Sequence, residues 1–67
     1  MTKLKFKKSG VYTTAETMFG EVMIHERLFA GEVKYMAYGL NSDDGLWFDT
    51  IKAAKDYLNR IYGNLAA

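Results

Sequence analysis

The spacing of glycine limits what the first two-thirds of this chain can fold into. Glycines stand at positions 10, 20, 31, 39 and 45, and the chain contains no proline. Segments of about ten residues that end in glycine are typical of a meander of short strands joined by turns. After position 45 no glycine follows until position 63, so a longer element is expected there.

Alternation of polar and apolar side chains predicts where the strands lie. Residues 3–7 alternate strictly, which places Leu4 and Phe6 on one face and three lysines on the other. Residues 11–14 are rich in β-branched and aromatic types and predict a hairpin partner for that strand. Residues 19–25 and 33–40 are further strand candidates. Residues 26–32 are expected to connect them, although Leu28 and Phe29 would also fit an extension of the strand.

The spacing of apolar residues along the chain changes at Thr50. Apolar residues then recur at helical spacing, at Ile51, Ala54, Leu58, Ile61 and Leu65. Asp49 or Thr50 is the expected N-cap, Asp56 and Arg60 an i,i+4 ion pair, and Gly63 a left-handed stop. Before the helix, residues 41–45 predict a turn, and residues 46–48 predict either a short strand or an apolar anchor for the helix.

These elements predict an α+β fold, with a three- or four-stranded antiparallel sheet and one C-terminal helix packed on one face. The expected unit is a single domain over residues 1–67, with strands within 3–48 and the helix at about 50–62. A chain of 67 residues buries only about 60% of its unfolded surface, so apolar packing must hold it together. Because it has no cysteine, we expect no disulfide and a reducing, cytoplasmic location.

Charge is unevenly distributed along the chain. Lys3, Lys5, Lys7 and Lys8 give the first eight residues +4, and the other five basic and eight acidic residues sum to −3. No window approaches the roughly 18 apolar residues of a membrane span, so a soluble protein is expected. The basic run also lacks the apolar stretch that a secretory signal needs.

The residue types needed for catalysis or metal binding do not cluster in the sequence. His25 is the single histidine, and Ser9 and Ser42 lie in predicted turns, so we expect no catalytic residues. Asp43 and Asp44 lack the alternating ligands and terminal glutamate of a calcium loop, so they are interpreted as turn formers. No enzymatic activity, metal or cofactor is predicted.

Aromatic and methionine side chains suggest binding instead. If Val22, Ile24, Val33 and Tyr35 face the helix, alternation sends a second set of residues to the opposite face of the sheet. This set is the candidate protein-binding surface, and it comprises Tyr12, Met23, His25, Lys34, Met36 and Tyr38. A tyrosine-covered, solvated sheet face without a partner fits the pattern equally well.

The four N-terminal lysines have two interpretations. Lysines on an edge strand deter edge-to-edge aggregation, which is the favoured interpretation. Contact of Lys3, Lys5, Lys7 and Lys8 with nucleic-acid phosphates is the alternative. Pairing of an open edge strand with its copy in a second chain would give a homodimer.

Residues 45–58, with Trp47, Phe48, the Thr50 cap and an alanine-rich helix, resemble the strand-to-helix junction of small phage and prophage proteins. Residues 33–62 are also similar to the arm DNA-binding domain of phage integrases, in which a three-stranded sheet enters the major groove. The chain departs from that pattern because its strand segments 21–25 and 33–38 contain one lysine and no arginine to contact bases.

The resemblance and the composition together predict a non-enzymatic phage or mobile-element protein. We expect it to bind another protein, such as a host or defence factor that it inhibits. The alternative is a DNA-binding module similar to the integrase domain.

Overall fold

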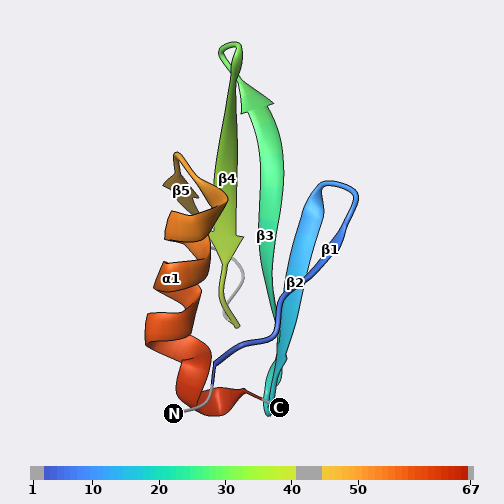
Figure 1. Cartoon of the computed structure of the whole chain (residues 1–67), viewed down its shortest axis with the longest axis vertical. Helices are drawn as coiled ribbons and strands as arrows, with labels where there is room; N and C mark the ends of the chain where they lie inside the picture. The colour runs from blue at the N-terminus through green and yellow to red at the C-terminus, as the bar shows by residue number, and fades with distance from the viewer. Residues whose placement is uncertain (1–2, 41–44, 67) are drawn as a thin grey trace.

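The computed structural model describes residues 3–40 and 45–66. Within these ranges the chain forms a five-stranded antiparallel sheet whose strand order follows the sequence (Figure 1). The α+β class with a C-terminal helix on one sheet face is confirmed, but the prediction of three or four strands is wrong. The elements are β1 (Lys7–Ser9), β2 (Tyr12–Thr17), β3 (Gly20–Phe29), β4 (Glu32–Tyr38), β5 (Leu46–Phe48), the helix α1 (Ile51–Tyr62) and a 3₁₀ turn η1 (Gly63–Leu65).

The N-terminal strand begins later than its alternation predicts. Residues 3–6 run off the sheet toward α1, where the backbone N–H of Leu4 donates to Oδ1 of Asn59 at 2.9 Å. Leu4 is buried and Phe6 half-buried, so the two apolar side chains do point inward. Leu4 belongs to the core cluster that includes Leu58 of α1, and Phe6 packs against it.

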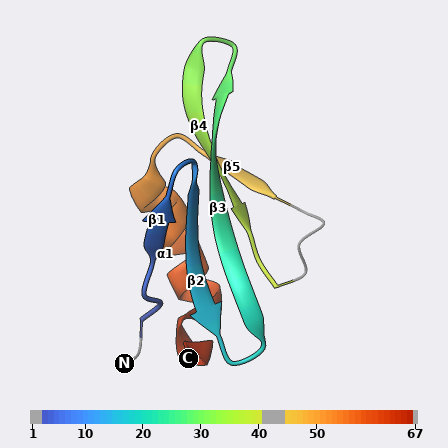
Figure 2. The same ribbon diagram turned by 90° about the vertical axis from the view of Figure 1, so that its right-hand side faces the viewer.

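The hairpin of β3 and β4 is longer than predicted. The prediction that residues 26–32 connect the two strands is wrong, because β3 continues to Phe29 and β4 begins at Glu32. The turn residues Ala30 and Gly31 have φ angles of 52° and 79°. Two positive φ values are typical of the type I′ turn, whose twist matches that of the flanking strands. Because both strands are long, the hairpin extends past the other strands and past α1 (Figures 1 and 2).

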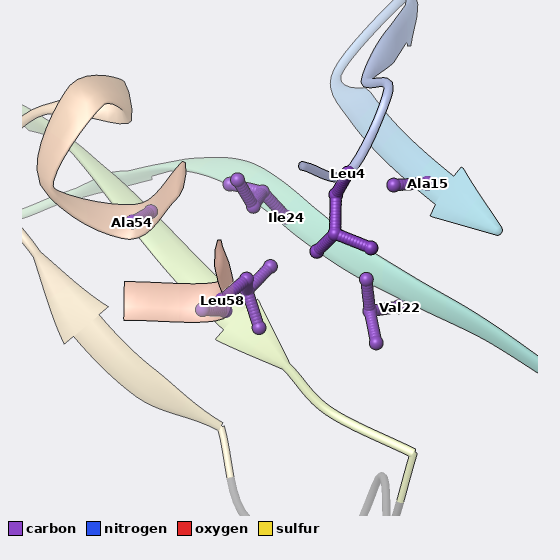
Figure 3. Close-up of a cluster of buried hydrophobic side chains, with 7 residues drawn as sticks. Leu4, Ala15, Val22, Ile24, Ala54 and Leu58 are labelled. Carbon is purple, nitrogen blue, oxygen red and sulfur yellow. The ribbon is translucent and has the colours of Figure 1, made fainter. Parts of the chain in front are cut away.

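The core lies between α1 and one face of the sheet. Val22 and Ile24 of β3 and Leu58 of α1 are its largest fully buried side chains. Figure 3 shows Leu4 and Leu58 reaching toward these β3 residues from the N-terminal segment and the helix. Three small residues, Ala15, Ala37 and Ala54, complete the buried hydrophobic cluster and leave room for the helix to approach the strands.

The helix start is confirmed, with Thr50 as the N-cap: its Oγ1 accepts a hydrogen bond from the Ala53 N–H at 3.1 Å. Two finer predictions are wrong. Asp56 pairs with Lys52, at 2.9 Å, and not with Arg60. Gly63 has a right-handed φ of −58°, so the chain continues into η1.

The end of the chain is fastened to β2. The Leu65 carbonyl accepts from the Met18 N–H at 2.8 Å, and Ala66 forms an isolated bridge with Thr17. The predicted turn at 41–45 falls mostly outside the described residues, as do Ser42, Asp43 and Asp44.

Candidate protein-binding face of the sheet

The face of the sheet opposite α1, called here the open face, carries all six predicted surface residues. Strand pairing aligns Tyr12 with His25 and Met36, Met23 with Tyr38, and Arg27 with Lys34. These positions alternate with the buried residues Thr13, Val22, Ile24 and Ala37, which face α1. The structure therefore brings together Tyr12, Met23, His25, Lys34, Met36 and Tyr38 on one surface.

One row of side chains crosses the entire open face. It takes one residue from each strand in register: Ser9, Tyr12, His25, Met36 and Trp47. The rings of Tyr12 and His25 stack with centroids 4.6 Å apart and planes 11° from parallel. Tyr12 and Trp47 are exposed, whereas His25 and Met36 are half-buried between them. Trp47 belongs to this row because β5 pairs with β4, which the sequence pattern of a short strand or anchor at residues 46–48 does not indicate.

Met36 and Tyr38 are held by contacts on the same face. The Tyr38 hydroxyl donates to the Met36 sulfur. A Cβ on Gly45 would overlap the Met36 side chain, so glycine at this position leaves space for it. Side chains that are already packed lose little rotamer freedom when a partner covers them, which favours binding.

At the hairpin end, the open face contains a hollow of about 240 Å³. It is lined by Phe29, Lys34, Trp47 and Asp49. The Phe29 and Trp47 rings lie 5.8 Å apart, tilted by 43°. Phe29 and Asp49 were missed as site residues. Phe29 continues the alternation of Met23, His25 and Arg27 along β3, and this signal would have identified it.

Lys34 lies beside two carboxylates. Its ammonium contacts Oδ1 of Asp49 and lies 3.5 Å from Oε2 of Glu32. The hydrogen bond with Asp49 raises the pKa of Lys34 above its usual range, with help from the charges of Asp49 and Glu32 and partial opposition from desolvation. The ammonium of Lys34 is thus oriented by its neighbours and does not extend freely into solvent.

Other apolar side chains are exposed at both ends of the molecule. Leu28 is 75% exposed and Val33 47%, on the same face of the sheet as Ile24 and Ala37 but beyond the part that α1 covers. Met18 and Phe19 are exposed in the turn between β2 and β3. The hairpin end is therefore apolar on both of its faces, with Leu28 and Val33 on one and Phe29 on the other.

The four N-terminal lysines do not form one stripe. Lys8 pairs in register with the buried Thr13 and so belongs to the helix side, whereas Lys7 pairs with Thr14. Lys5 and Lys7 line a second hollow, of about 250 Å³, together with Glu16 and Glu21. Lys3 is exposed in the segment before β1. Two glutamates therefore interrupt the basic surface that a phosphate backbone would need.

Within residues 3–40 and 45–66, no group of three or more acidic or histidine side chains is arranged to hold a metal ion. In the same part of the chain, no helix is both long and apolar enough to cross a bilayer.

Comparison with protein-family models, curated proteins and solved structures finds no match for this chain.

Proposed function

We propose that this is a non-enzymatic binding protein that docks to another protein through its open face. The observation that supports this most strongly is the row from Tyr12 through His25 and Met36 to Trp47, on the side of the sheet that α1 leaves uncovered. Tyrosine, tryptophan and methionine are enriched in protein interfaces because each removes a large apolar area from water at modest entropic cost.

The proposal extends to the biological setting. The protein is a cytoplasmic phage or mobile-element product that inhibits a host or defence factor by covering one of its surfaces. What supports this is the resemblance of residues 45–58 to the strand-to-helix junction of small phage and prophage proteins. In this chain those residues comprise β5 and most of α1, joined by the Thr50 cap.

A DNA-binding role is the alternative, and it depends on Lys3, Lys5, Lys7 and Lys8. Glu16 and Glu21 share the hollow with Lys5 and Lys7, and Lys8 lies on the other side of the sheet. Phosphate contacts need positive charge that is not offset locally, so this arrangement favours protein over DNA as the partner.

Affinity capture from host extract with matched baits tests the proposed function. The baits are the wild-type chain, Tyr12→Ala on the open face and Arg60→Ala on the exposed side of α1. A partner that docks on the open face is retained by wild type and Arg60→Ala and lost by Tyr12→Ala. Equal capture by all three baits, or loss only with Arg60→Ala, contradicts the proposal. Circular dichroism must show that each bait is folded.

A further inference from the structure

We propose that the hollow between Phe29 and Trp47 receives an arginine side chain of the protein partner. This inference rests on the proposed function, because the hollow lies at the hairpin end of the open face. It assigns a specific chemistry to one part of that face, where two aromatic rings and two carboxylates converge.

The two rings provide the stacking surfaces. Phe29 is 63% exposed and Trp47 45%, and their 43° tilt opens an angle between them instead of a closed stack. The face of an indole or phenyl ring carries a negative quadrupole, which attracts a cation placed over it. A volume of about 240 Å³ leaves room for a planar group against the indole.

The two carboxylates beside the hollow supply hydrogen-bond acceptors for the same group. Arg27 and Lys34, which pair in register on this face, contribute +1 each, and Asp49 and Glu32 contribute −1 each, so the four charges balance. The carboxylate side chains are 83% and 72% exposed, respectively. Lys34 contacts Oδ1 of Asp49 and Oε2 of Glu32, which leaves the other oxygen of each carboxylate to accept a further donor.

A guanidinium fits this combination better than other side-chain groups. It is planar, so it stacks on Trp47, and its several N–H groups can donate to a carboxylate at the same time. An ionised acidic side chain has no donor to offer the two carboxylates. An aliphatic side chain would displace water from them without replacing the hydrogen bonds that the water makes.

A titration with small probes tests the inference on the full-length protein. The probe is N-acetyl-arginine methylamide, and the matched control is its citrulline analogue, which has nearly the same shape but no charge. Trp47 is the single tryptophan, so its indole N–H gives one assignable NMR signal. We expect the arginine probe to shift this signal with a Kd on the order of 1 mM, as suits so small a ligand. Citrulline should bind at least fivefold more weakly.

Variants locate the binding site. The double variant Glu32→Gln with Asp49→Asn should weaken arginine binding at least fivefold. Asp56→Asn is the control, because Asp56 is another exposed carboxylate paired with a lysine, but on α1. Equal binding of both probes, unchanged binding in the double variant, tighter binding of N-acetyl-glutamate methylamide, or no shift at all overturns the inference. None of these outcomes affects the proposed function, which the Tyr12→Ala bait decides separately.

Discussion

The backbone N–H of Leu4 and the side-chain oxygen of Asn59 are hydrogen-bonded although 55 residues separate them in the chain. This contact ties the N-terminal segment to α1 and places the Leu4 side chain in the core beside Leu58. The segment thus belongs to the packed unit even though it lies outside the sheet.

Asn59→Ala removes this tie and should lower the free energy of unfolding by about 1 kcal/mol. For a domain of this size that corresponds to a fall in the melting temperature of about 4–8 °C. Asn64→Ala, at an exposed position in η1, is the control and should change the melting temperature little. Equal melting temperatures for the two variants would show that the Leu4 contact carries no stability.

Leu58→Ala should destabilise the fold far more, because Leu58 is fully buried between the helix and β3. The expected loss is about 2–5 kcal/mol, from lost burial and the cavity left behind. A protein of 67 residues has a total stability of only about 3–10 kcal/mol, so this variant is expected to be partly unfolded. The control is Ile61→Ala, which changes a residue that is 48% exposed. A denaturant titration that ranks Ile61→Ala as the more damaging change would contradict this assignment of the helix face.

Tyr38→Ala and Tyr12→Ala should each reduce partner capture at least tenfold, since a central truncation in an interface typically costs about 2 kcal/mol. The two variants should differ in stability. Tyr38 is half-buried and bonded to Met36, so its loss should lower the melting temperature more than loss of the exposed Tyr12. Binding and melting are measured on the same samples. If Tyr12→Ala binds normally, the row across the open face is not the interface.

The ion pair of Lys34 predicts a response to alkaline pH. Because Asp49 raises the pKa of Lys34 in the folded state, the pair's contribution to stability is complete below the unfolded pKa of lysine. That contribution is lost as the pH rises through the higher folded pKa. In an NMR titration of the wild-type chain, the pKa of Lys34 should lie above the ordinary value for a lysine. In Asp49→Asn the pKa of Lys34 should fall, and an unchanged midpoint would contradict the role given to Asp49.

We expect no sequence-specific DNA complex. If all four N-terminal lysines contacted phosphates, the affinity would fall with salt at a log–log slope of about −3 to −4. Gel-shift and salt-titration measurements on duplex DNA test this expectation. A selective complex at micromolar protein with such a slope would favour the integrase-like alternative over protein binding.

Local sequence determined much of this fold. Alternation in β3 and β4 was enough to separate Val22, Ile24 and Tyr35 from the residues of the open face, because successive side chains of a strand point to opposite sides. Helical spacing after Thr50 located α1 and placed Leu58 in the core for a similar reason. Both patterns depend on neighbours a few positions apart, so they are visible without knowledge of the rest of the chain.

Tertiary structure decided the features that depend on distant residues. Alternation could not show that residues 3–6 leave the sheet, since that outcome depends on the space beneath α1 and on Asn59. Nor could it show that Ile61, although apolar and at helical spacing, is exposed. The hollow at the hairpin end joins Phe29 and Lys34 to Trp47 and Asp49 only because β5 pairs with β4. Contacts of this kind arise from packing whole elements against each other, and no local periodicity specifies them.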